Sequence, residues 1–98
     1  MEVRHDDSTL QRLEADPKFT GGFDAALVKA FRKRLQFIRA ASDERTFYAM
    51  KSLHYEKLKG DREGQRSMRL NSQWRLIMRL EEDTLGRTVV VVSISDYH

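Results

Sequence analysis

Two arginines in the second half of the chain are spaced so that they could bind an anion together. Residues 65–70 and 74–80 both alternate apolar and polar side chains, a pattern typical of strands with one face on a core. Joining these strands through residues 71–73 places Arg69 opposite Arg75 and keeps the apolar side chains on one face, whereas a two-residue turn mixes the faces. Like charges directly opposite each other are mildly destabilising, and an anion between them would relieve the repulsion. The alternative is that both side chains extend separately into solvent.

The basic residues of the chain also favour an anionic ligand. Of the 18 Lys and Arg residues 12 are Arg, and the net charge is +3. The planar arginine fork suits phosphate, so such a surface favours nucleic acid, with an ordinary solvated surface as the alternative. The lack of Cys excludes disulfides and thiol catalysis. His5, His54 and His98 are too far apart in sequence for metal-ligand spacing, so we expect no metal and no cofactor.

Length and hydropathy bound the class of protein. The 98 residues are enough for one domain with its own core, and we assign residues 1–98 to a single domain. No apolar run approaches the length of a membrane span, and the first ten residues, MEVRHDDSTL, lack the apolar core of a signal peptide. We therefore expect a soluble cytoplasmic protein that does not contact a membrane.

The first half of the chain predicts helices. Residues 6–8 offer capping oxygens for a short helix that ends near Ala15, and the Pro and Gly residues that follow predict a loop over 16–23. Asp24 precedes the clearest helix, 25–41, because its apolar residues recur at helical spacing. A second short helix is predicted over residues 44–52, and its expected core residues are Phe47 and Met50.

The second half predicts strands around the hairpin. Residues 53–59 are expected to be strand-like or irregular and to lead into a glycine turn over 60–64. Residues 81–86 are expected to form an acidic connection. The β-branched run 88–94 predicts a strand that is buried on both faces and lies inside the sheet. Residues 2–5 could add an edge strand.

This order of elements predicts an α+β fold, with N-terminal helices packed on one face of a small antiparallel sheet. The apolar sheet face that would take the long helix carries Met68, Leu70, Trp74, Leu76 and Met78. The opposite face carries Arg69, Arg75 and Arg79 and would remain open as a basic surface.

Three segments of the second half carry a family resemblance. LHYEKLKGDREG begins at Leu53, SMRLNSQWRL follows it, and a valine-rich strand then ends in DYH. In this order and spacing they resemble the HigB-type toxins of the RelE/ParE superfamily, often named plasmid maintenance system killer proteins. The resemblance covers residues 53–98, and the helical first half agrees in layout. It implies a compact α+β toxin that cleaves mRNA on the translating ribosome, and a cognate helix-turn-helix antitoxin that neutralises it.

The resemblance also implies catalytic residues. Cleavage of RNA through its own 2′-hydroxyl requires a base, an acid for the leaving 5′-oxygen and positive charge around the transition state. Arg75, at the QWR position, would clamp the scissile phosphate, and Lys59 of the LKG motif would add positive charge near the reacting oxygens. His98 would act as general acid or base, because the ordinary pKa of histidine lies near neutral pH. Asp96 would orient His98.

Further residues are expected to bind the RNA. Arg69 would act from its position opposite Arg75, Tyr97 would stack on a base or donate a hydrogen bond, and the basic side chains of Lys57 and Arg79 would contact the RNA as well.

The identity of the general base and the role of His54 stay open. Relatives often have a His at the position of Glu56, so no catalytic role is transferred to His54. Glu56 or Glu63 could serve as the base, or both could simply belong to a solvated turn.

An alternative function also stays open. The superfamily includes gyrase-poisoning members, so the chain could be a non-nuclease toxin that inhibits DNA gyrase by binding it. The DYH ending and the arginine pair favour the nuclease.

Overall fold

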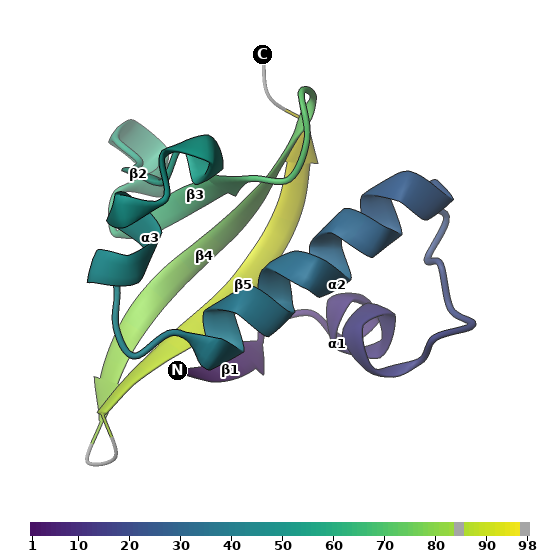
Figure 1. The fold of residues 1–98 in the computed structure, drawn as a ribbon, viewed down its shortest axis with the longest axis horizontal. Helices are drawn as coiled ribbons and strands as arrows, with labels where there is room; N and C mark the ends of the chain where they lie inside the picture. Colours follow the sequence, from purple (N-terminus) through teal and green to yellow (C-terminus); the bar gives the residue numbers. More distant parts are fainter. Residues whose placement is uncertain (84–85, 97–98) are drawn as a thin grey trace.

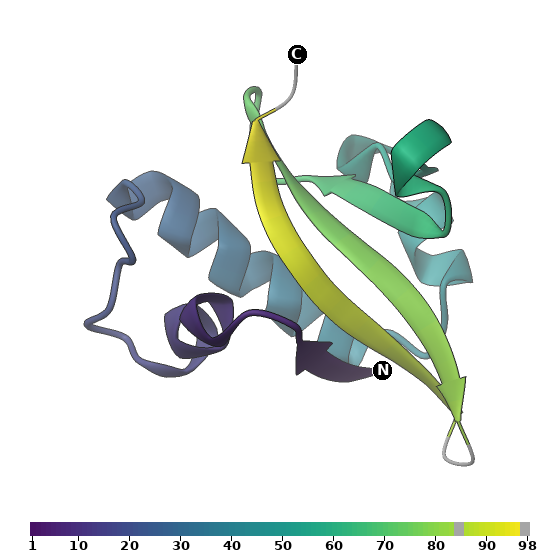
Figure 2. The ribbon, with the colours of Figure 1, turned by 180° about the vertical axis from the view of Figure 1, so that it is seen from behind.

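The helices cover one face of a five-stranded sheet, which Figures 1 and 2 show from opposite sides. The computed structural model describes residues 1–83 and 86–96. Its strands follow the spatial order β1-β5-β4-β3-β2. The strands are β1 (Glu2–His5), β2 (Glu56–Lys57), β3 (Gln65–Arg69), β4 (Trp74–Asp83) and β5 (Gly86–Asp96). The helices are α1 (Ser8–Ala15), α2 (Ala25–Ala40) and α3 (Arg45–Ala49), with 3₁₀ turns η1 (Lys51–Leu53) and η2 (Gly60–Arg62).

The first two helices begin at the predicted caps. The Asp7 carboxylate accepts hydrogen bonds from the backbone N–H groups of Thr9 and Leu10, and the Asp24 carboxylate accepts one from Leu27 at 2.8 Å. Each cap satisfies backbone donors that have no partner inside the helix. No helix in residues 1–83 and 86–96 is long and apolar enough to span a membrane.

The predicted helix over residues 44–52 is divided in two. The backbone turns to an extended conformation at Met50, with φ −94° and ψ 93°, and this ends α3 before η1 begins. Phe47 is fully buried, as expected. Met50 is 42% exposed, so its predicted core role was wrong: beyond the end of α3 its side chain no longer follows the apolar side of the helix.

The hairpin has the predicted register. Arg69 pairs with Arg75 across β3 and β4, and the three residues of the connection form a bend. The side-chain oxygen of Asn71 accepts hydrogen bonds from the backbone N–H groups of Gln73 and Trp74, both at 2.8 Å. Asn commonly closes turns in this way, which explains why this loop length was predictable.

The β4–β5 pair differs from the prediction. The expected acidic connection is largely strand, because β4 extends to Asp83 and β5 begins at Gly86. Across this pair Arg87 donates to Glu82 at 2.8 Å, so one of the acidic side chains that suggested a loop is neutralised within the ladder.

The predicted position of the valine-rich strand is confirmed. β5 lies inside the sheet between β1 and β4, and Val89, Val90 and Val91 are all buried. β1 pairs with β5 in parallel, so the α+β fold is confirmed but the sheet is mixed and not purely antiparallel. The chain between these two strands contains every other element, which leaves enough length for a parallel return.

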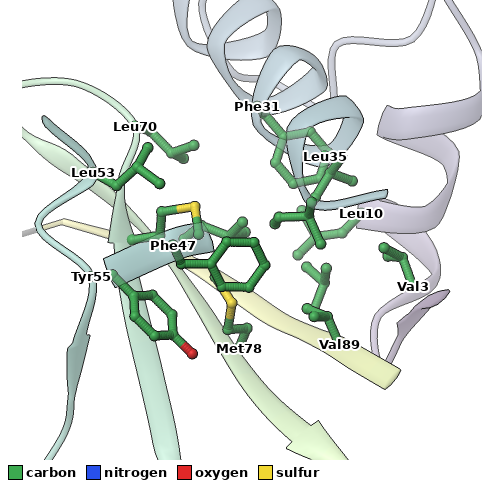
Figure 3. Packing of buried hydrophobic residues seen from close by; sticks show 14 of the residues in the cluster. Val3, Leu10, Phe31, Leu35, Phe47, Leu53, Tyr55, Leu70, Met78 and Val89 are labelled. Carbon is green, nitrogen blue, oxygen red and sulfur yellow. The ribbon is translucent and has the colours of Figure 1, made fainter. Parts of the chain in front are cut away.

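The core lies between the sheet and the helices. Phe31 and Leu35 of α2 face Met78 and Val89 of the sheet, and α3 adds Phe47 beside them (Figure 3). All five of these side chains have 0% exposure. Because this face is closed by packing, a polar site on the sheet must lie on the other sheet face or at the edges.

Glu14 links α1 to α2 and to β1. Its carboxylate accepts hydrogen bonds from Arg39 at 2.8 and 2.9 Å and lies 2.8 Å from the His5 ring. The Arg39 hydrogen bonds lower the pKa of Glu14 below its ordinary value of 4.5, against the opposing effect of burial. A carboxyl with a lowered pKa stabilises the folded state above its ordinary pKa, and this contribution is lost as the pH falls through the folded-state pKa.

We therefore expect Glu14→Gln to reduce the loss of unfolding free energy between about pH 7 and about pH 3. Urea unfolding of wild type and variant at both pH values measures this difference. Glu63→Gln is the control, because the exposed Glu63 side chain makes no hydrogen bond or ion pair within residues 1–83 and 86–96. If the stability of Glu14→Gln depended on pH as strongly as that of the wild type, Glu14 would not contribute to the pH dependence, and the prediction would be wrong.

Candidate active site

Arg75 is the central side chain of the sheet face opposite the helices. Its neighbours in β4, Trp74 and Leu76, point toward the core, so strand alternation directs Arg75 the other way. Its Nε donates to the Ser67 hydroxyl at 2.9 Å, and its Nη2 donates to the backbone carbonyl of His54. The side chain is only 9% exposed. The predicted open basic surface was therefore wrong at Arg75, because these hydrogen bonds draw the guanidinium against the sheet.

A carboxylate lies beside this guanidinium. Glu56 Oε1 is 3.5 Å from Arg75 Nη2, and the Glu56 side chain is 51% exposed. Glu56 pairs with Ser67 in the β2–β3 ladder, which places it on the same face as Arg75. The site therefore presents one buried cation next to one accessible acid.

A first cavity of about 290 Å³ opens next to Arg75 at the end of the hairpin. Its lining comes from the end of η1, from β2, β3 and β4, and from the hairpin loop: His54, Glu56, Arg69, Asn71, Ser72 and Arg75. Arg69 Nε donates to the backbone carbonyl of Asn71 at 3.1 Å, which holds this arginine at the loop. The two opposed arginines thus share one cavity.

A second cavity of about 260 Å³ lies on the same sheet face and also borders Arg75. Its other lining residues are Leu58, Arg62, Ser67, Ile77, Ser95 and Asp96. Arg75 is common to both cavities, so a group bound to this guanidinium would have space on two sides.

His54 reaches the first cavity through an unusual backbone conformation. It has φ 47° and ψ 47°, in the left-handed region that few residues other than Gly adopt. In this position its N–H donates to Lys51 and its carbonyl accepts from Arg75. The local sequence carries no signal for this conformation, so the contact between the His54 carbonyl and Arg75 could not be predicted.

Tyr55 anchors the segment that carries His54 and Glu56. Its ring packs edge-on against Phe47 and Tyr48, with centroids 5.3 and 4.8 Å away. Its hydroxyl donates to Glu44 at 2.6 Å. Burial, followed by the hydrogen bond to Glu44, raises the pKa of Tyr55 well above its ordinary value, so the phenol stays neutral. The two cavity residues on either side of Tyr55 are thereby tied to the core.

The other predicted site residues are distributed more widely. Asp96 lines the second cavity and accepts a hydrogen bond from Gln73 at 3.1 Å. Lys57 and Lys59 are exposed and are not among the described lining residues of either cavity. Arg79 lies on the same sheet face but pairs with Asp6 and Glu81. Tyr97 and His98 lie outside the described residues.

The site also contains residues whose position sequence reasoning left open or did not find. Glu56 was one of two candidate bases, and it faces the cavity from a strand of two residues, too short for alternation to be visible. Arg62 and Ser67 line the second cavity, and only the spatial position of η2 and β3 brings them to Arg75.

Comparison with known proteins agrees with this fold. A YoeB/ParE toxin from Agrobacterium tumefaciens is 19% identical with a TM-score of 0.61, and each chain is covered fully. The YoeB–YefM complex from Staphylococcus aureus gives 17% identity and a TM-score of 0.61, covering 100% of this chain and 97% of the other. YafQ from E. coli is 12% identical with a TM-score of 0.57, and the match covers 97% of this chain and 91% of YafQ. At such identities the likeness concerns the fold alone.

The comparison of sequences identifies the family. No curated protein matches the chain. A family model described as the RelE-like toxin of type II toxin–antitoxin system HigB matches residues 3–98. Because this match spans nearly the whole chain, the protein belongs to the HigB-like family of RelE-like toxins of type II toxin–antitoxin systems.

Proposed function

We propose that this toxin is an endoribonuclease that cleaves mRNA on the translating ribosome without a metal ion, through attack by the substrate's own 2′-hydroxyl. The observation that supports this most is the first cavity, in which Arg69 and Arg75 accompany an accessible carboxylate on Glu56. This arrangement combines positive charge for a phosphate with a group that can accept a proton.

In the proposed reaction the scissile phosphate lies against Arg75. The hydrogen bonds to Ser67 and His54 fix the guanidinium in advance, so little side-chain freedom is lost when the phosphate binds. Glu56 or the His54 ring takes the proton of the 2′-hydroxyl as its oxygen attacks phosphorus. The bond from phosphorus to the 5′-oxygen breaks, and a cyclic phosphate and a 5′-hydroxyl result.

His98, oriented by Asp96, would donate the proton to the leaving 5′-oxygen. Lys57 and Lys59 would contact the RNA backbone outside the cavities, with Lys59 adding positive charge near the reacting oxygens, and Tyr97 would stack on a base. Arg79 would bind RNA only after it separates from Asp6 and Glu81.

We also propose a cognate helix-turn-helix antitoxin as the partner. Solved structures similar to this chain include the YoeB–YefM complex and the toxin–antitoxin complex RelBE2 from Mycobacterium tuberculosis, which is 18% identical with a TM-score of 0.50 and covers 98% of this chain and 96% of the other. A nuclease directed at the mRNA of its own cell requires such control. Its site of action would be the cytoplasm, where ribosomes translate.

Primer extension on cellular mRNA after brief induction tests this function. We expect discrete new 5′ ends inside translated frames with the wild type and their loss with His98→Ala, because the leaving oxygen is then not protonated. A message without its start codon is the control for ribosome dependence and should remain intact. Arrested growth with intact mRNA would contradict the proposal and favour inhibition of gyrase, which DNA damage would reveal.

A further inference from the structure

The second cavity carries a cation that the rest of the described structure does not neutralise. Arg62 is exposed on η2 and lines this cavity. Within residues 1–83 and 86–96 its side chain makes no hydrogen bond or ion pair. Arg75 and Arg79 on the same sheet face both have carboxylate partners. Arg62 is thus available for an anion from outside the chain.

The walls of this cavity differ from those of the first one. Ile77, which is only 3% exposed, and the half-buried Leu58 give this cavity two apolar lining residues. The hydroxyls of Ser67 and Ser95 and the Asp96 carboxylate supply polar groups. An apolar surface with hydrogen-bonding groups at its border suits a nucleobase, which has apolar faces and polar edges.

The size and position of the cavity limit what it can hold. Its volume of about 260 Å³ is below the roughly 300–1,000 Å³ typical of sites for drug-sized ligands. It therefore has room for no more than a single nucleotide unit. Because Arg75 borders both cavities, a phosphate on Arg75 directs one flanking nucleoside toward each of them.

We propose that the second cavity is a nucleoside subsite beside the scissile phosphate, in which Arg62 binds the next phosphate of the RNA and Leu58 and Ile77 contact the base. This inference rests on the proposed function and extends it to substrate recognition. Phosphate contacts position a nucleic acid, whereas base contacts select its sequence. Removal of Arg62 should therefore weaken binding to RNA of every sequence by a similar factor. Removal of Leu58 should change which base is preferred in the subsite.

Binding of non-cleavable RNA to the intact protein tests this subsite. The probes are four trinucleotides that carry hydrogen in place of the 2′-hydroxyl at the scissile position and differ in the next base. Amide NMR titration of the 98-residue chain follows each residue separately. We expect signals of Ile77 and Ser95 to shift, and Arg62→Ala to weaken binding about tenfold to hundredfold for every probe.

Two further variants give the comparison. Leu58→Ala should alter the order of the binding affinities for the four probes, while its amide spectrum remains that of a folded protein. Lys18→Ala removes one positive charge from an exposed loop position and should bind within about twofold of the wild type, since a single distant charge is screened.

The outcomes separate this subsite from the proposed function. Shifts confined to Asn71 and Ser72 of the first cavity, or unchanged affinity in Arg62→Ala, would overturn the subsite and leave the nuclease intact. Shifts spread evenly over the surface would also overturn it, as they indicate nonspecific charge attraction. Intact mRNA with the wild-type toxin in the primer-extension experiment would instead remove the proposed function itself.

Discussion

Arg75→Ala is expected to lower mRNA cleavage by about 10²–10³-fold and to remove growth inhibition. Arg75 is the only side chain common to both cavities among their described lining residues, and its guanidinium is fixed before any substrate arrives. A preoriented cation stabilises charge that develops on the phosphate without reorganising in the transition state. The measurement is the amount of new 5′ ends per induced toxin molecule.

The effect on folding must be separated from the effect on chemistry. Without the guanidinium, the Ser67 hydroxyl and the His54 carbonyl lose a partner, at a cost of about 1–3 kcal/mol. Thermal unfolding of the purified variant measures this loss directly. Arg75→Lys keeps the charge but not the fork, so we expect intermediate activity.

Arg45→Ala is the matched control for the loss of an arginine. The Arg45 side chain is 91% exposed and pairs only with Asp43 among the described residues. Its activity should equal that of the wild type. A folded Arg75→Ala protein that still cleaves mRNA at the wild-type level would refute the central role of Arg75.

Phe47→Ala is expected to lower the free energy of unfolding by about 3–5 kcal/mol. Phe47 has 0% exposure and packs against Phe37 at 6.0 Å and Tyr55 at 5.3 Å, measured between ring centroids. Truncation leaves a cavity between α3, α2 and the sheet (Figure 3). A loss of this size is a large part of the roughly 5–15 kcal/mol that stabilises a domain. Denaturant unfolding measures it.

Tyr48→Ala provides the comparison on the same helix. Tyr48 is 49% exposed and contacts the same Tyr55 ring, at 4.8 Å, from the solvent side. Its removal should cost about 0.5–1.5 kcal/mol, the value of one aromatic pair. Equal losses in the two variants would show that α3 does not depend on its buried face.

Much of the fold could be predicted because short-range patterns specify it. Alternation in residues 65–70 and 74–80 led to the register that places Arg69 opposite Arg75, and this register is confirmed. The caps Asp7 and Asp24 likewise follow from side chains that bond to nearby backbone. Such features depend on residues a few positions apart, so the linear sequence contains the relevant physics.

Where prediction failed, the outcome depended on contacts that the hydrophobic pattern does not show. β1 joins β5 in parallel from the other end of the chain, and the β4–β5 ladder, in which Glu82 pairs with Arg87, continues through most of the expected loop. Met50 became exposed because α3 ended early. Each result reflects contacts that local spacing does not encode.

The candidate site divides in the same way. The sequence by itself determined the family, the fold class and the register that sets Arg69 opposite Arg75; phosphate binding by this pair remains a prediction. Only the tertiary structure buried Arg75 and brought His54, Glu56 and Arg62 to its two sides. The physical reason is that these neighbours come from a left-handed residue, a two-residue strand and a 3₁₀ turn, whose directions are set by packing against the core and carry no periodic signal.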